Sequence, residues 1–364
     1  MSCTAGINCL ADLRHRRERP RRRSPESRFS PFSSSSLTAS CSSRHAAKLS
    51  AALKPTSLLK NRSPAAGKTL RCAREATPLE SDTTSQFLDE VLQVAVKVAV
   101  AGGAVVREKV GADVIKTKAN PRDLLTEVDG EVQQLIEAQV RTFFPEHGFL
   151  GEESVPPGAL ASAAAIDSLL TSGPEWLWIV DPIDGTTNFV HGMPMSAISI
   201  GVSFRGEVVA AVILDPFREE CFSARLGGGA FLNGKEIRVG EQTSAGEAVV
   251  ATGYAPNPAA AGPLLRGMTA LATLPVRSMR MLGSAAVMFA WVACGRLTAY
   301  FEADLSCWDI AGGALLVKEA GGLITDLDGS QYTLRTRAVL ASNNCTHNEL
   351  IGALQEANCT GLDS

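Results

Sequence analysis

One short segment, Asp181–Thr187 (DPIDGTT), concentrates groups that bind cations and anions. It follows an apolar strand predicted over residues 176–180, and Pro182 fixes its own φ at about −65°. We therefore expect a tight turn that points Asp181 and Asp184 at one small volume, together with the carbonyl of Ile183. Carboxylates that close raise each other's pKa unless a cation neutralises them. The segment predicts bound Mg²⁺ or a shared proton, because hard oxygen ligands suit Mg²⁺.

The residues that follow predict an anion site. Gly185 and Thr186 supply backbone N–H groups and a hydroxyl at the expected N-terminus of a helix, where phosphate binds readily. The alternative is a capped turn, in which Asp184 or Thr186 only satisfies unpaired helix donors. Two further acidic segments favour the chemical interpretation: Glu152-Glu153 ends a strand predicted over 148–151, and Asp309 opens a helix predicted over 308–320. Glu153 is expected to lie outside the ligand set, and His191 to be a packing residue.

Together these segments resemble the inositol monophosphatase family. That family belongs to the larger group of Mg²⁺-dependent, lithium-sensitive phosphatases that includes fructose bisphosphatases. The resemblance covers about residues 86–355. It is carried by GEES from Gly151, WIVDPIDGTTNFVHG from Trp178, GSAA from Gly283, CWDIAGG from Cys307 and EAGG from Glu319. Ordered motifs at these spacings make the likeness specific.

The resemblance implies two or three Mg²⁺ ions. Glu152, Asp181 and the carbonyl of Ile183 are expected to hold the first. Asp181, Asp184 and Asp309 are expected to hold the second, and Glu152 is expected to contact a third ion through water. Mg²⁺ usually keeps several coordinated waters and binds few carboxylates, which also fits four acids shared among two or three ions.

The resemblance also assigns the remaining roles. Thr186, paired with Asp129, matches residues that orient the attacking water, and Lys118 matches a lysine of a mobile loop, although Lys116 competes for that position. The expected catalytic residues are Thr186, Asp129 and Glu152. The expected substrate-binding residues are Asp184, Gly185, Thr186, Ala285, Glu302 and Asp309, of which Ala285 and Glu302 line the polyol side.

The expected reaction is hydrolysis of a small phosphate monoester without a covalent enzyme intermediate. The first candidate substrate is myo-inositol 1-phosphate. Histidinol phosphate, galactose 1-phosphate and an adenosine bisphosphate are alternatives within the same chemistry. A regulatory protein that keeps the fold but works by binding a partner is an alternative of another class. The resemblance further implies a homodimer.

Hydrophobic periodicity predicts the elements that position these residues. Helices are expected over 85–110, 129–144, 262–274, 284–293 and 308–320, with a hairpin or loop over 114–126 and a loop with one short helix over 156–173. Strands are expected over 148–151, 176–180, 197–204, 208–214, 221–224, 249–252, 276–280, 299–302 and 323–326. The pattern indicates an α+β half over 77–225 and an α/β half over 226–364. The resemblance implies a layered αβαβα sandwich of the sugar-phosphatase type.

The first 76 residues differ from the rest of the 364-residue chain in charge: they carry 16 Lys and Arg against four Asp and Glu. An arginine cluster over 14–23, a serine run over 33–36 and the lack of an apolar core predict a disordered transit peptide. The segment Arg71-Cys72-Ala73 favours a chloroplast over a mitochondrion, with cleavage near Cys72. A basic tail that binds RNA or membrane is the alternative.

Composition narrows the possible partners. A hydrophobic fraction of 45% supports a real core and excludes disorder throughout. Beyond residue 76 the chain is acidic, so a nucleic-acid partner is not expected. No run reaches the roughly 18–20 apolar residues that span a bilayer, so no membrane partner is expected either. The nine cysteines show neither a disulfide framework nor a zinc-site spacing. The partner that the resemblance implies is a small-molecule phosphate ester.

Overall fold

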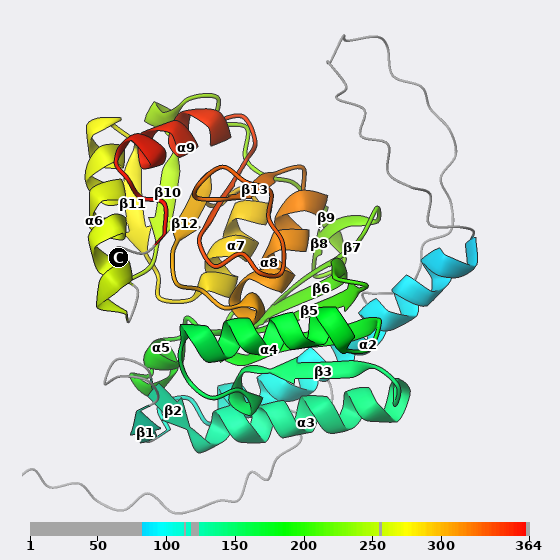
Figure 1. Ribbon diagram of the computed structural model, residues 1–364. Coiled ribbons are helices and arrows are strands. Elements are labelled where there is room, and N and C mark those ends of the chain that lie inside the picture. Colours follow the sequence, from blue (N-terminus) through cyan, green and yellow to red (C-terminus); the bar gives the residue numbers. More distant parts are fainter. Residues whose placement is uncertain (1–81, 113, 118–123, 255–256, 362–364) are drawn as a thin grey trace, which may run out of the picture. The chain divides into compact units, whose positions relative to one another are not determined.

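The computed structural model describes residues 82–112, 114–117, 124–254 and 257–361, which form alternating layers of helix and sheet (Figure 1). Helices α2 (Asp82–Glu108) and α3 (Glu127–Phe143) cover one face of a seven-stranded sheet. Helices α7 (Ala285–Ala293) and α8 (Cys307–Glu319) lie between that sheet and a five-stranded sheet, whose other face carries α6 (Pro258–Thr273) and α9 (His347–Glu356). The predicted αβαβα sandwich is confirmed.

The larger sheet is antiparallel except for its first pair, β3 and β4. Along β4, Leu177 and Ile179 pack toward α7 and α8, whereas Trp178 and Val180 pack toward α2 and α3. The sheet is therefore buried on both faces, which explains the continuous apolar run. In order across the sheet, its strands are β3 (Gly148–Gly151), β4 (Trp176–Asp184), β5 (Ala197–Phe204), β6 (Glu207–Asp215), β7 (Glu220–Arg225), β8 (Gly229–Leu232) and β9 (Lys235–Ile237).

The smaller sheet is mixed: β10 lies parallel to both β11 and β12, and β14 lies antiparallel to both β12 and β13. The prediction omitted β14 and α9. Strand β14 lies between β12 and β13 and pairs with both. In order across the sheet, its strands are β11 (Ser278–Met281), β10 (Val249–Thr252), β12 (Ala299–Glu302), β14 (Val339–Ser342) and β13 (Leu323–Asp326).

Small residues let α8 approach the larger sheet closely. A Cβ added at Gly201 of β5 would lie 2.7 Å from the Cβ of Ala311, and one added at Gly312 would lie 3.1 Å from the carbonyl oxygen of Ile200. Either substitution would push the helix away from the strand. This contact matters for the site, because the first turn of α8 carries Asp309.

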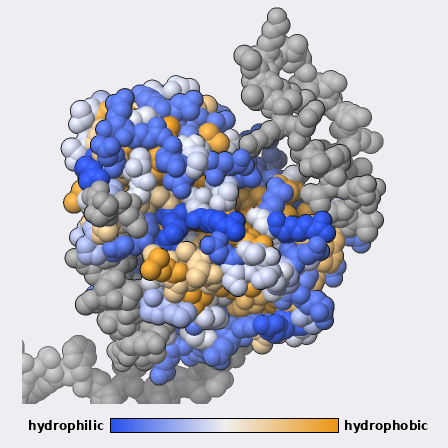
Figure 2. Space-filling view, in the orientation of Figure 1, coloured by the Kyte–Doolittle hydropathy of each residue, from blue (hydrophilic) through white to orange (hydrophobic). Residues whose placement is uncertain are grey.

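Most predicted elements differ from the structure by three residues or fewer at either end, and three differ more. The strand expected to end at Val180 continues as β4 to Asp184. The segment 156–173, expected to be a loop with one short helix, contains the 14-residue helix α4 (Ala159–Ser172), which buries Ile166 and exposes Leu160. Figure 2 shows that polar and apolar residues both reach the surface on this face of the molecule. Helix α6 begins at 258 rather than 262, because the Asn257 side chain caps it by accepting a hydrogen bond from Ala259 N at 3.0 Å.

Short elements complete the described part of the chain. The segment 114–126 contains an antiparallel pair, β1 (Val114–Thr117) and β2 (Leu124–Thr126). The predicted leader over 1–76 lies outside the described residues. The division between residues 225 and 226 stays a prediction; β8 and β9, which follow it, belong to the larger sheet. Among the described helices, none combines the length and hydropathy needed to cross a bilayer.

Candidate active site

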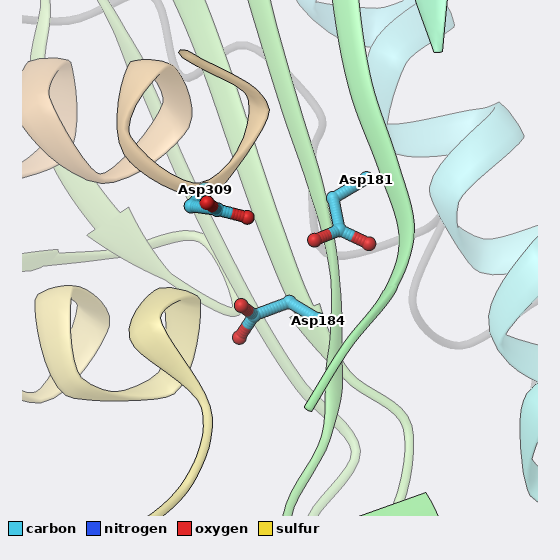
Figure 3. A group of neighbouring side chains, drawn as sticks. All are labelled: Asp181, Asp184 and Asp309. Atoms are coloured by element: carbon cyan, nitrogen blue, oxygen red, sulfur yellow. The ribbon is translucent and has the colours of Figure 1, made fainter. Parts of the chain in front are cut away.

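Three aspartates meet where β4 ends and α8 begins. Asp181, Asp184 and Asp309 each offer a carboxylate oxygen, and the three oxygens lie within 4.8 Å of one another. Figure 3 shows the carboxylates directed toward a common volume. Asp181 and Asp184 are buried, and Asp309 is partly buried. Three negative charges in so small and dry a volume repel one another strongly unless protons or a cation offset them.

An irregularity in β4 brings Asp181 and Asp184 together. Residues three apart in a regular strand point to opposite faces of the sheet. Here the pairing with β5 shifts register between Asp181 and Asp184, around Pro182, which has no N–H to donate to the ladder. Asp181 Oδ1 accepts a hydrogen bond from Ile183 N at 2.9 Å, which holds the irregular segment in place. The convergence predicted from a tight turn is thus produced by a shift in strand register.

The N-terminus of α7 holds the carboxylate of Asp184. Its Oδ2 accepts a hydrogen bond from the Ser284 hydroxyl and another from Ala286 N at 2.9 Å. Ser284 also caps α7 by accepting from Val287 N at 3.2 Å. Burial raises the pKa of Asp184 to about 6, although these hydrogen bonds oppose the rise and the charge of Glu152 adds to it. Asp184 is therefore fixed in position, and its charged form is still disfavoured by burial.

Asp309 is held by its own helix. It is the third residue of α8, and its Oδ2 accepts a hydrogen bond from Ser306 N at 2.6 Å in a capping box. Burial raises its pKa well above the ordinary value, and the charges of Glu152 and Asp184 raise it further. These effects place Glu152 in the electrostatic neighbourhood of both aspartates.

Glu152 begins the short 3-10 helix η1 (Glu152–Ser154) directly after β3. Helix α3 fixes η1 through Gln133, whose Oε1 accepts from Glu153 N at 2.8 Å and whose Nε2 donates to Ser154 Oγ at 2.9 Å. Glu152 is partly buried and borders the same cavity as Asp184 and Asp309. It lies beside the three-aspartate cluster, without belonging to the group of oxygens within 4.8 Å.

A second polar pair lies on the other side of the β4 end. The Thr186 hydroxyl donates to Ile183 O at 3.1 Å and reaches Asp129 Oδ1 at 3.4 Å. Asp129 is buried and caps α3, since its Oδ2 accepts from both N (2.9 Å) and Oγ1 (2.5 Å) of Thr126. The structure therefore brings Thr186 to the two residues Asp129 and Ile183; the pairing with Asp129 was expected, and the bond to the Ile183 carbonyl was not. Lys118 lies outside the described residues.

Gly185 requires its lack of a side chain. Its φ is +91°, in the left-handed region, and an added Cβ would lie 2.9 Å from the carbonyl oxygen of Gly283. Only glycine combines this conformation with this closeness. It begins the short helix α5 (Thr186–Val190). His191 ends that helix as an exposed residue at the cavity, so the expectation that it packs inside the protein was wrong.

Glu152, Asp184, His191 and Asp309 line one cavity of about 1570 Å³. Glu302 and Ala285 line the same cavity, and both are buried. Glu302 Oε2 accepts a hydrogen bond from the Tyr300 hydroxyl at 2.5 Å. Burial raises the pKa of Glu302 to about 7, the Tyr300 hydrogen bond opposes that rise, and the charge of Asp184 adds to it.

Sequence reasoning missed three residues that position the site. Ser284 lies in the quoted GSAA segment as a recognisable helix cap, but its bond to Asp184 spans 100 residues. Tyr300 gives no local signal of its bond to Glu302. Arg337 lines the cavity and donates to Ser162 Oγ at 2.6 Å and to Asp304 Oδ1 at 3.0 Å, which joins α4 to the loop before α8.

The donor set fits a hard divalent cation such as Mg²⁺. Its ligands are carboxylate oxygens, and the described cluster contains neither thiolate nor imidazole. Burial, with a smaller contribution from the charge of Glu152, raises the pKa of both Asp184 and Asp309, so the charged forms are costly here. A cation there would offset that cost and face the cavity, where a phosphate ester can enter.

The known proteins that this chain resembles include inositol monophosphatases. A profile of the inositol monophosphatase family matches residues 87–359. The chain is 37% identical over 265 residues to inositol monophosphatase 1 of Bos taurus, covering 72% of this chain and 92% of that protein. It is 39% identical over 272 residues to inositol monophosphatase 2 of Solanum lycopersicum, covering 74% and 100%. The solved structure of the Thermotoga maritima IMPase matches with a TM-score of 0.64 and 32% identity, covering 74% and 98%.

Proposed function

The chain belongs to the inositol monophosphatase family, a family of phosphatases, and we propose that it hydrolyses myo-inositol 1-phosphate to myo-inositol and phosphate. The observation that carries the proposal is the convergence of Asp181, Asp184 and Asp309 on one side of a large cavity. Phosphate monoesters hydrolyse very slowly in water, so a catalyst must stabilise the charge on both the attacking and the leaving oxygen. A carboxylate cluster that holds divalent cations supplies that stabilisation.

We assign the metal-holding role to Glu152, Asp181, the Ile183 carbonyl, Asp184 and Asp309, with two to three Mg²⁺ ions. When bound there, Mg²⁺ supplies positive charge for the phosphate oxygens and lowers the pKa of a coordinated water. The contribution of the chain is to fix the ligands. Ser284 and the N-terminus of α7 hold Asp184, and the first turn of α8 holds Asp309. Because the ligands are held before substrate arrives, little reorganisation is needed during reaction.

The Thr186–Asp129 pair is assigned to the attacking water. The Asp129 carboxylate is held by Thr126 and faces the Thr186 hydroxyl. When the Thr186 hydroxyl donates its hydrogen bond to Asp129, its oxygen lone pairs are free to accept a hydrogen bond from water. The water can thus be oriented without a covalent intermediate. Gly185 and Thr186 offer backbone N–H groups to the phosphate at the start of α5.

Glu302 is assigned to the leaving alcohol. It is a buried carboxylate at the cavity wall, and a carboxylate accepts hydrogen bonds from polyol hydroxyls. Ala285 lies beside it at the N-terminus of α7. This environment suits a neutral polyol. A cationic amino alcohol also suits an acid, so histidinol phosphate is the second candidate, and galactose 1-phosphate the third.

Phosphate release from the purified full-length chain tests the proposal. With Mg²⁺, we expect release from inositol 1-phosphate, and we expect none after chelation. Galactose 1-phosphate and histidinol phosphate serve as comparison substrates. A kcat/KM more than tenfold higher for histidinol phosphate than for inositol 1-phosphate would overturn the substrate assignment. Absence of release from every ester would instead favour a regulatory protein on the same fold.

Two further proposals concern location and assembly. We propose that residues 1–76 direct the chain to the chloroplast, because they are basic, rich in serine and poor in acids. Fusion of these residues to a fluorescent protein should give plastid fluorescence, and mitochondrial or cytosolic fluorescence would contradict the assignment.

We also propose a homodimer, by analogy with the family. Light scattering on the purified chain tests it, and a monomer mass would contradict it.

A further inference from the structure

The carboxylate of Glu302 is immobilised from two sides by residues outside the predicted site. On one side, the Tyr300 hydroxyl donates to Oε2 at 2.5 Å. On the other side lies the backbone of Gly253, which directly follows β10, the strand paired with β12. A Cβ added at Gly253 would overlap all three carboxyl atoms of Glu302. The carboxylate therefore rests on bare backbone.

Glycine is required at position 253 because there is no room for a side chain, not because of its backbone conformation. Its φ is outside the left-handed region, so an alanine could adopt the same backbone. The positions that need glycine for conformation, such as Gly185, have φ between +20° and +160°. The carboxylate of Glu302 therefore explains why position 253 has no side chain. Substitution there would force the Glu302 side chain to another rotamer, because a backbone-borne Cβ cannot move aside.

Tyr300 is rigid enough to act as a fixed donor. Its ring is fully buried and packs edge-on against Phe289, with ring centroids 4.8 Å apart. Its hydroxyl donates to Glu302 Oε2. One oxygen of Glu302 is therefore partly satisfied by the protein, and Glu302, which lines the cavity, keeps further acceptor capacity.

We propose that Tyr300 and Gly253 are positioning residues that determine specificity for polyol esters, by holding the Glu302 carboxylate where leaving-group hydroxyls reach it. This inference rests on the proposed phosphatase function. Neither residue belongs to the three-aspartate cluster. We therefore expect them to affect which leaving alcohol the protein prefers, and not how it binds the phosphate. An ester whose leaving group lacks hydroxyls gains nothing from it.

The test compares two esters, inositol 1-phosphate and 4-nitrophenyl phosphate, in the full-length protein with Mg²⁺. The readout is the ratio of their kcat/KM values. Tyr300→Phe keeps the ring packing and removes only the donor, and it should lower the ratio about tenfold, mainly through a higher KM for inositol 1-phosphate. Gly253→Ala should lower the ratio at least as much. The double variant Gly253→Ala/Glu302→Asp, whose shorter acid leaves room for the new Cβ, should recover part of it.

Gly352→Ala is the matched control, because an added Cβ at Gly352 of α9 meets nothing within 4 Å. It should leave the ratio at the wild-type value. If Tyr300→Phe and Gly253→Ala fold, as judged by circular dichroism, and keep the wild-type ratio, the inference is overturned while the phosphatase function stands. If Gly253→Ala does not fold, Tyr300→Phe alone decides. A wild-type protein inactive on both esters overturns the proposed function, and this inference with it.

Discussion

Two acidic regions border the same cavity and are surrounded differently. Asp181, Asp184 and Asp309 face one another, and the pKa values of Asp184 and Asp309 are raised by burial and by neighbouring acids. Glu302 is also buried, but its direct partner is the neutral hydroxyl of Tyr300. One region has several charges that need a cation. The other has a single acceptor held by a neutral donor.

This difference separates two kinds of buried acid. Acids that face acids are stable together only when positive charge or protons neutralise them, so their arrangement predicts a metal site. An acid that faces a neutral donor keeps acceptor capacity for another hydroxyl, so its arrangement predicts contact with substrate. Burial and a raised pKa alone do not distinguish the two, since both regions have them.

The largest expected effect is in the aspartate region. Asp184→Asn should lower kcat for inositol 1-phosphate by at least about 100-fold, the scale of losing one preorganised electrostatic contact. Steady-state phosphate release with saturating Mg²⁺ measures it. Asp328→Asn, which changes an exposed acid, is the control and should retain wild-type turnover. Near-normal turnover in Asp184→Asn would show that the two regions do not differ as described.

An intermediate effect is expected from the support of Asp184. Ser284→Ala removes the hydroxyl that donates to Asp184 Oδ2, and a hydrogen bond to a charged group contributes about 1.5–3 kcal/mol. We expect kcat to fall about tenfold and the Mg²⁺ concentration for half-maximal activity to rise. Ser284→Thr keeps a hydroxyl and should restore most of the activity. Equal activities in the alanine and threonine variants would contradict a positioning role.

In the Glu302 region the expected effect is on substrate choice. Glu302→Gln keeps the shape and halves the acceptor capacity, so the KM for inositol 1-phosphate should rise about tenfold. The Mg²⁺ concentration for half-maximal activity should stay at the wild-type value, because Glu302 is not assigned to the metal. A shift in that concentration as large as the one caused by Ser284→Ala would remove the distinction between the regions.

The smallest expected effect is on stability without metal. The pKa of Glu302 is about 7 in the folded protein against an ordinary 4.5, so its contribution to stability is full below pH 4.5 and is lost as pH rises through 7. In chelator, the melting temperature of Glu302→Gln relative to wild type should therefore rise by a few degrees between pH 4.5 and 8. A difference that stays constant across this range would contradict the buried environment.

Local pattern predicted most of the fold. Strands β5, β10, β12 and β13 begin and end where the apolar runs do, because turn residues bound them. Strand β14 was missed, and its stability comes from pairing with β12 and β13 on either side. Helix α9 was also missed; it forms no side-chain cap hydrogen bond and packs against α6 and β14. Such elements are fixed by tertiary neighbours, which a local window does not contain.

The site follows the same division. Residue types and motif spacing singled out Asp181, Asp184 and Asp309, since this many acids in ordered motifs exceed what helix caps need. The means of convergence was not predictable, because the register shift in β4 depends on its pairing with β5. Likewise, the bonds of Ser284 to Asp184 and of Tyr300 to Glu302 are tertiary facts. Sequence therefore singled out the three aspartates, and the structure shows what holds them in place.

The central claim is that Asp181, Asp184 and Asp309 together bind a divalent cation. Isothermal titration of Mg²⁺ into the full-length protein, freed of metal beforehand, tests it most directly. We predict saturable binding to wild type and to Glu302→Gln, and loss of at least one binding event in Asp309→Asn. Identical binding curves for wild type and Asp309→Asn, or no binding to wild type, would contradict the claim.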